Sequence, residues 1–62
     1  GYIPTLASLL YQMELSTNGT TWEPVNTVTG AAAPAASMPI ADPDWILRTG
    51  NHRWYRVSQF NP

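Results

Sequence analysis

Side chains that could act as a general base or nucleophile are few in this 62-residue chain. Nucleophilic catalysis needs a nucleophile, a base and a group that orients the base. His52 is the single histidine and there is no cysteine, so His52 is the only candidate base, and it stands among turn-forming residues. The sequence predicts an exposed, structural His52, and we expect no enzymatic activity.

The four carboxylates form two possible pairs, and glycoside hydrolysis uses such a pair. Glu14 and Glu23 are better explained as a solvated sheet face, where a tight hairpin would set them opposite each other. Asp42 and Asp44 are better explained as a turn, with Asp44 capping a short helical turn over residues 45–47. One histidine without thiolates cannot build a closed zinc site, and a spaced calcium loop is absent from the sequence. We expect no cofactor and no metal.

Aromatic side chains are the residues best suited to binding. Trp22, Trp45, Trp54 and Tyr55 could stack on carbohydrate from a sheet face, or could anchor a protein interface, where Trp, Tyr and Arg are enriched. They could equally form the core of a small protein that has no disulfide. We expect Trp22 and Tyr55 in the core, and Trp45 and Trp54 at an interface.

The first ten residues are too apolar for a solvated tail, so we expect this arm to dock on the domain or on a neighbour. Arginine is also common at interfaces. The predicted interface residues are Tyr2, Ile3, Leu6, Trp45, Trp54 and Arg56.

Charged residues make up 11% of the chain, against roughly 25% in ordinary soluble domains. Thr, Ser, Asn and Gln supply the polar surface instead, which fits an extracellular β module or a subunit covered by neighbours. The net charge of −1 argues against a nucleic-acid binder, which needs a basic footprint. Apolar runs stay well short of a membrane span. We expect Arg48, Arg53 and Arg56 to pair with the acids.

The length allows one small domain over residues 1–62. A chain of this size buries only roughly 60% of the surface that its unfolded form exposes, so its stability is marginal. Disulfides are excluded because there is no cysteine. An aromatic core, oligomerisation or docking on something larger must stabilise it.

Residues 11–28 form the clearest structural signal, a β-hairpin. Tyr11, Met13 and Leu15 alternate with polar residues, which is typical of a strand with one buried face. Asn18-Gly19 favours a two-residue turn because both residues tolerate positive φ. Asn18-Gly19-Thr20 is also formally an N-glycosylation acceptor, but the turn explains it fully.

A two-residue turn would fix the register of this hairpin. Leu15 would then face Trp22, and Met13 would face Pro24, with the aromatic and aliphatic side chains on one face. Pro24 cannot donate to a ladder, so the second strand is expected to be an edge strand or to be broken there.

The remaining segments are an arm, a connection and a strand. Residues 1–10 are expected to be extended, although a helical turn after Thr5 or a continuation of the following strand is also compatible with them. Residues 30–43 form a long Ala/Pro-rich connection, for which Met38 and Ile40 are the natural anchors.

Residues 53–60 alternate and predict a strand that follows a turn at Gly50-Asn51. Tyr55 and Val57 would face the core, and Phe60 is a further candidate for it. Trp54 and Arg56 would lie on the other face, where Trp54 could stack with an arginine.

Two stretches, YQMELSTNGTTWEPVNTVTG and HRWYRVSQFNP, follow each other in a familiar order. They resemble the middle of a fibronectin type III-like, or immunoglobulin-like, β-sandwich module of secreted bacterial proteins, over about half of the chain. A full module of this kind has about 100 residues and two strands before the tyrosine strand. The resemblance implies a truncated or remodelled sandwich whose open edges invite strand pairing.

We therefore expect an all-β fold, either a small antiparallel meander or a truncated β-sandwich. The predicted function is that of a structural subunit that self-associates or docks on an extracellular filament, a sheath or a virion surface. The alternative is a carbohydrate- or surface-binding module of a larger secreted protein.

Overall fold

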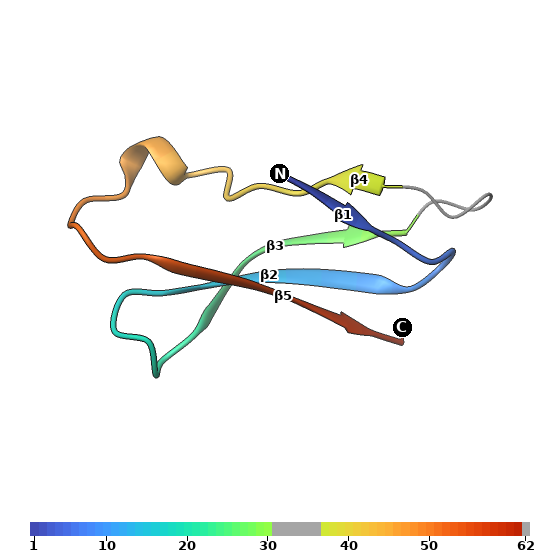
Figure 1. Ribbon diagram of the computed structural model, residues 1–62, viewed down its shortest axis with the longest axis horizontal. Coiled ribbons are helices and arrows are strands. Elements are labelled where there is room, and N and C mark those ends of the chain that lie inside the picture. The colour runs from blue at the N-terminus through green and yellow to red at the C-terminus, as the bar shows by residue number, and fades with distance from the viewer. Residues whose placement is uncertain (31–36, 62) are drawn as a thin grey trace.

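The computed structural model describes residues 1–30 and 37–61, and strands make up most of its regular structure (Figure 1). The elements in chain order are β1 (Tyr2–Pro4), β2 (Leu10–Ser16), β3 (Glu23–Thr29), β4 (Ser37–Pro39), the 3₁₀ helix η1 (Trp45–Leu47) and β5 (Trp54–Phe60). The predicted all-β class is confirmed. None of the helical structure in the described residues is long and apolar enough to cross a membrane.

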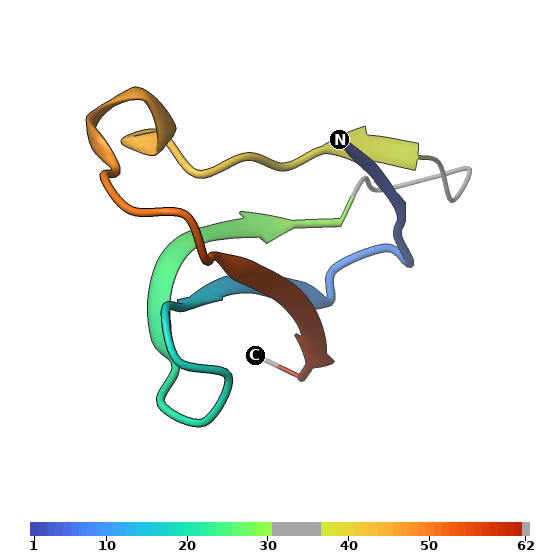
Figure 2. The ribbon, with the colours of Figure 1, turned by 60° about the vertical axis from the view of Figure 1, so that its left-hand side comes forward.

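The strands form two antiparallel sheets. The larger sheet has the order β3-β2-β5, with β2 at its centre, and the smaller sheet pairs β1 with β4. Figure 2 shows the small sheet as a separate layer beside the large one. The arrangement is a small, incomplete sandwich, in which β3 and β5 are the two edges of the large sheet.

One face of the large sheet, here called the inner face, is turned toward the small sheet. It carries alternate residues of β2, including Tyr11 and Leu15, and their β5 partners Gln59 and Tyr55. The backbone N–H of Leu6 donates to the hydroxyl oxygen of Tyr11 at 2.6 Å. This hydroxyl in turn donates to Gln59 Oε1 at 2.8 Å. A single tyrosine therefore ties the N-terminal arm to both β2 and β5.

The apolar core is minimal. Among the described residues, only Tyr11, Leu15 and Ile40 are buried large apolar side chains. Nine large apolar residues are exposed instead: Tyr2, Leu6, Trp45, Ile46, Leu47, Trp54, Tyr55, Val57 and Phe60. This balance matches the small buried fraction expected of so short a chain.

The predicted two-residue turn at Asn18-Gly19 is wrong. The strands end at Ser16 and resume at Glu23, so six residues connect them. Gly19 does adopt the positive φ of +80°, but Asn18 does not.

Two side chains account for the longer connection. The Ser16 hydroxyl oxygen accepts from the backbone N–H groups of Asn18 at 3.3 Å and Gly19 at 2.8 Å. Asn18 Oδ1 accepts from the N–H groups of Thr20 and Thr21, both at 2.8 Å. These bonds satisfy the loop backbone locally, which a type I′ turn would have left to the strand ladder.

The longer loop also changes the register. Leu15 lies opposite Glu23, and Met13 lies opposite Asn26, so the predicted partners Trp22 and Pro24 are wrong. The ladder shifts between Met13 and Glu14, where Pro24 lies. Of the two expectations for the strand that contains Pro24, the first is confirmed: β3 is an edge strand, and it continues through Pro24 with a register irregularity beside it.

The N-terminal arm is extended and docks as predicted. Ile3 in β1 lies opposite Met38 in β4, and the N–H of Ile40 donates to the carbonyl oxygen of Gly1 at 3.0 Å. Met38 and Ile40 thus anchor the end of the Ala/Pro-rich connection, as expected. The part of that connection from 31 to 36 lies outside the described residues.

The short helical turn over residues 45–47 is present, but the capping role predicted for Asp44 is wrong. Asp44 makes no side-chain capping bond. Asp42 holds the turn instead, because its carbonyl oxygen accepts from Trp45 N at 3.2 Å and its Oδ1 accepts from Asp44 N at 3.0 Å. Gly50 provides the positive φ of +96° for the next turn, as expected.

Candidate interaction surface

The most exposed apolar strand in the structure is β5. All seven of its residues are exposed. Trp54, Tyr55, Val57 and Phe60 each expose 37–45% of their surface. These apolar residues occur on both faces of the strand, because alternate residues of a strand point to opposite faces. β5 therefore presents apolar surface on two sides as well as an open edge.

The two edges of the large sheet differ in their protection. β3 contains Pro24, has an irregularity beside it, and its Asn26 Nδ2 donates to the carbonyl oxygen of Ala41 at 2.7 Å. β5 pairs with β2 without any register shift, has no proline within Trp54–Phe60 and carries one charge, Arg56. Proline, irregularities and charges are the usual devices that prevent edge pairing, so β5 is the less protected edge.

The other face of the large sheet, here called the outer face, is crossed by a chain of three side chains. The Arg56 guanidinium lies over the Trp22 ring, 4.2 Å from the ring centroid. Its Nε donates to Glu14 Oε1 at 3.0 Å. Trp22 is half-buried and lies outside the predicted core, because the longer loop carries it to the Arg56 side of the sheet. This arrangement fixes the Arg56 side chain on the exposed face.

The predicted stacking of Trp54 on an arginine is wrong. Trp54 stacks on His52 instead, with ring centroids 6.0 Å apart and an interplanar angle of 13°. Phe60 lies opposite Leu10 on the outer face and is exposed, so it does not join the core. Tyr55, predicted as core, is also exposed along its ring, although its hydroxyl is bonded.

A buried carboxylate connects β5 to the segment before it. Asp42 is 4% exposed and accepts from Arg48 Nε at 2.9 Å and Nη2 at 3.1 Å. The Tyr55 hydroxyl donates to Asp42 Oδ2 at 2.9 Å. The Arg48 hydrogen bonds, with further help from Asp44 N–H and Tyr55, lower the pKa of Asp42 to about 2, although burial opposes the shift.

The pKa values of the Asp42 partners shift in the opposite direction. The hydrogen bonds to Asp42 raise the pKa of Arg48. Burial of the hydroxyl, together with the bond to Asp42, raises the pKa of Tyr55. All three groups therefore keep their ordinary charge states at neutral pH, and the cluster acts as a fixed hydrogen-bonded clamp.

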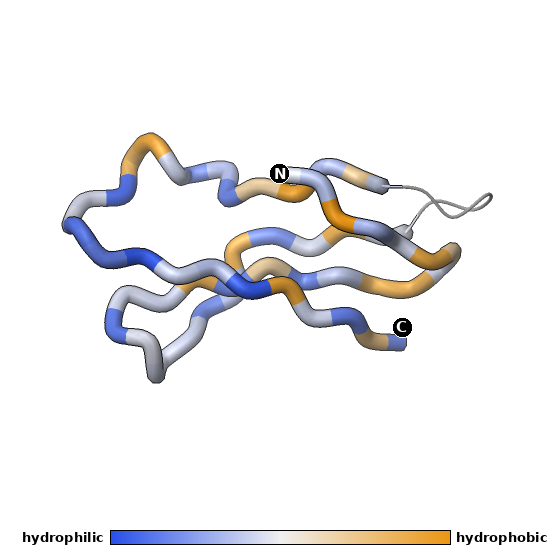
Figure 3. The backbone as a smooth tube through the Cα atoms, viewed as in Figure 1, coloured by the Kyte–Doolittle hydropathy of each residue, from blue (hydrophilic) through white to orange (hydrophobic). Residues whose placement is uncertain are grey.

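Beyond the Asp42 cluster, the η1 turn forms an apolar tip at the periphery (Figure 3). Trp45 is 62% exposed, and Ile46 and Leu47 are more than 70% exposed. Arg53 Nη1 donates to the carbonyl oxygen of Trp45 at 3.2 Å, which connects the tip to the start of β5.

The predicted interface residues fall into three groups. Trp45 lies on the η1 tip, and Trp54 and Arg56 lie on β5. Tyr2 and Leu6 are exposed on the N-terminal arm, whereas Ile3 is half-buried against β4. The exposed residues Val57, Phe60, Ile46 and Leu47 were missed. The sequence does contain a signal for Val57 and Phe60, because apolar residues fall on both faces of the strand 54–60.

The candidates for acid–base chemistry do not assemble into a site. Glu14 lies opposite Pro24 and Glu23 opposite Leu15, so the predicted apposition of these two carboxylates is wrong. Each carboxylate lies near a different arginine. Arg56 Nε donates to Glu14 Oε1 at 3.0 Å, and Glu23 Oε1 lies 4.0 Å from Arg48 Nη1. His52 is exposed. No group of three or more His, Asp or Glu within 1–30 and 37–61 could hold a metal ion.

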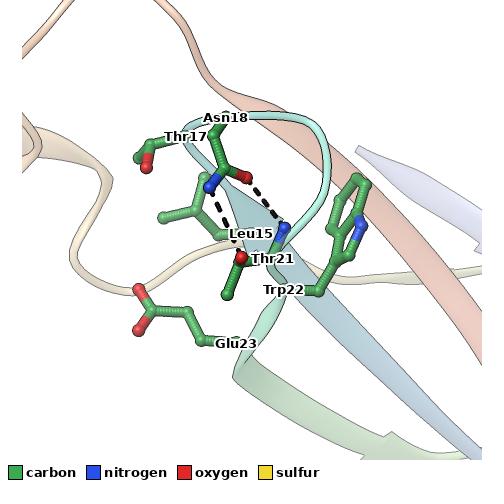
Figure 4. Close-up of a pocket in the computed structure, with 6 residues that line it drawn as sticks. All are labelled: Leu15, Thr17, Asn18, Thr21, Trp22 and Glu23. Carbon is green, nitrogen blue, oxygen red and sulfur yellow. Dashed lines mark hydrogen bonds between the residues drawn. The ribbon is translucent and has the colours of Figure 1, made fainter.

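A small pocket lies beside the β2–β3 loop (Figure 4). Its volume is about 230 Å³, and it is lined by Leu15, Thr17, Asn18, Thr21, Trp22 and Glu23. This is below the roughly 300–1,000 Å³ of typical small-molecule sites. The Asn18 amide makes hydrogen bonds within the loop itself, where its Nδ2 donates to Thr21 Oγ1 at 3.4 Å. The Asn18 and Thr21 side chains at the pocket are therefore engaged within the loop.

Comparison with known proteins gives no relative from which a function could be transferred. A scan against protein-family models, a search of curated proteins and a search of solved structures each found no match.

Proposed function

We propose that this chain is a non-enzymatic structural subunit that associates with other copies of itself, as in an extracellular filament, a sheath or a virion surface. The observation that carries the proposal is β5, a seven-residue edge strand whose residues are all exposed. An exposed apolar edge of this kind is a template for pairing with another chain. Association would cover side chains that the monomer cannot bury.

The size of the core supports the same proposal. The described part of the chain buries three large apolar residues and leaves nine exposed. Exposed apolar patches of soluble proteins commonly mark interaction sites. The apolar residues of β5 and of the η1 tip lie on adjoining segments and could be covered together.

The fibronectin type III-like arrangement remains part of the proposal. The placement of β1 and β4 over the inner face of the β3-β2-β5 sheet supports a two-layer sandwich. The small number of strands fits a truncated version, in which an edge that a longer sandwich would cover is available to a partner.

The alternative function, a carbohydrate-binding module, has weaker support. Arg56 occupies one face of Trp22, and His52 occupies one face of Trp54. A sugar that stacks on either ring would have to use the remaining face. Quenching of tryptophan fluorescence by soluble glycans would favour this alternative.

Sedimentation velocity over a range of protein concentrations tests the proposal. We expect the sedimentation coefficient to rise with concentration. Replacing Trp54 by Ala should reduce association while the thermal unfolding of the chain changes little, because Trp54 is 45% exposed. A chain that stays monomeric at the highest concentration would contradict self-association. Unfolding of the Trp54→Ala monomer would instead show that Trp54 stabilises the fold.

A further inference from the structure

The geometry points to the partner of β5. We infer that β5 pairs antiparallel with β5 of a second copy about a two-fold axis at Val57, which would join two three-stranded sheets into one of six strands. This inference rests on the proposed function, and it adds the partner strand, the symmetry and the register. It follows from the residue order in β5 and from the difference between the two sheet edges.

A two-fold axis perpendicular to the sheet restricts the possible registers. Each residue keeps its face in both copies, so opposite residues must lie on the same face, and one residue must lie opposite its own copy. An axis at Val57 pairs every residue of Trp54–Phe60. Shifting the axis by one residue in either direction leaves two residues of the strand without a partner inside β5.

Charge distinguishes between the remaining registers. An axis at Arg56 would place two guanidinium groups directly opposite each other, which is unfavourable. An axis at Ser58 would place Arg56 opposite Phe60. The axis at Val57 places Arg56 opposite Ser58, a small neutral side chain, while each Arg56 keeps its own Glu14 at 3.0 Å.

The axis at Val57 also places the apolar residues of the two β5 strands opposite one another. Trp54 lies opposite Phe60 twice on the outer face, and aromatic cross-strand pairs of this kind stabilise antiparallel sheets. Val57 meets its own copy on the inner face, where the small sheet leaves it exposed. The exposed apolar residues of β5 outside the Asp42 clamp thus all gain apolar neighbours.

The opposite edge of the sheet would limit pairing through sheet edges to two copies, so a larger assembly of this subunit would join such dimers through other surfaces. Pro24 and the adjacent irregularity protect β3, so the six-stranded sheet would not extend further by edge pairing. A contact through one strand per copy is smaller than a standard protein interface. We therefore expect a concentration-dependent dimer and not a permanent one.

Cysteine cross-linking tests the register, because the chain has no native cysteine. Residues directly opposite in an antiparallel pair have Cα atoms about 4.5–5.5 Å apart, within disulfide range. Val57→Cys, oxidised with diamide, should give a disulfide-linked dimer. Thr27→Cys is the control, because Thr27 is exposed on β3, the opposite edge of the sheet, and its two copies would lie far apart.

A charge-swap series tests the same contact without a covalent bond. Ser58→Lys places a cation opposite Arg56 of the second copy and should raise the dimer Kd at least about tenfold. Ser58→Glu places an anion there and should leave the Kd unchanged or lower it. Thr27→Lys, at an exposed outer-face position of β3, is the control and should dimerise like the wild type.

The results separate this inference from the proposed function. If the wild type associates but Val57→Cys cross-links no faster than Thr27→Cys, and Ser58→Lys associates normally, the β5 register is wrong while self-association stands. If the wild type stays monomeric and Val57→Cys does not cross-link, both are wrong. In that case the pairing partner of β5 would be a strand of a different protein or of a longer chain.

Discussion

At the scale of single residues, Asp42 is a buried carboxylate whose side chain accepts four hydrogen bonds. Its carboxylate accepts from Arg48, Tyr55 and the N–H of Asp44, and it connects the segment after β4 to β5. The sequence presents Asp42 only as part of an Asp-Pro-Asp turn. Its partners lie 2, 6 and 13 residues away, so their convergence depends on the tertiary fold.

The stability of the chain should depend on pH through Asp42. The pKa of Asp42 in the folded chain is about 2, below its ordinary value of 3.8. A lowered pKa stabilises the folded state above pH 3.8, and this contribution is lost as the pH falls from 3.8 through about 2. Asp42→Asn should reduce stability at neutral pH and flatten the acid dependence in this window.

Thermal unfolding followed by circular dichroism between pH 2 and 7 measures this effect. Asp44→Asn is the matched control, since Asp44 makes no side-chain capping bond, and it should keep the wild-type profile. If the Asp42→Asn curve runs parallel to the wild-type curve from pH 4 to 2, the Asp42 clamp does not stabilise the fold.

At the scale of elements, the β2–β3 connection shows that hydrogen bonds from local side chains can determine the conformation of a loop. Ser16 is buried, and its hydroxyl accepts two loop N–H groups and donates to Asn18 Oδ1 at 3.1 Å. Ser16→Ala would remove the acceptor of these two part-buried hydrogen bonds, each of which contributes roughly 0.5–1.5 kcal/mol to the free energy of unfolding.

Urea unfolding monitored by tryptophan fluorescence measures the loss in Ser16→Ala. The control is Thr17→Ala, because Thr17 is exposed, and it should change the free energy of unfolding by less than about 0.5 kcal/mol. Equal losses in both variants would show that the loop is not held by the Ser16 hydroxyl.

The strands themselves could be predicted from the sequence. The alternation in 11–15 and in 53–60 depends only on period two, and it identifies β2 and β5. The register could not be predicted, because Asn18-Gly19 favours a two-residue turn and the competing bonds from Ser16 and Asn18 become visible only in the folded loop. The displaced register then moved Trp22 from the expected core to the Arg56 face.

At the scale of the whole molecule, the small core makes each buried side chain important. Leu15 is 2% exposed, and truncation of such a residue costs roughly 2–5 kcal/mol. Leu15→Ala should therefore remove most of the stability of a chain this small, as measured by urea unfolding. Leu47→Ala, at an exposed position of η1, is the control. A small loss in Leu15→Ala would mean that association, and not the core, maintains the fold.

The all-β class and the docking of the arm followed from composition and apolar patterning. The prediction of an interface in the arm was less specific, since Ile3 is used within the chain against Met38. Which apolar residues remain exposed depends on how far the small sheet reaches across the large one, and the sequence does not encode that reach locally.

Hydrogen exchange of the backbone amides tests the central claim, association through β5, most directly. Amides of β5 that point away from β2 lie on the open edge of the sheet in the described part of the chain, so their exchange should slow as the protein concentration rises. Amides of β3 provide the internal reference and should exchange at a constant rate. Exchange in β5 that does not change with concentration, in a chain that stays folded, would contradict the account.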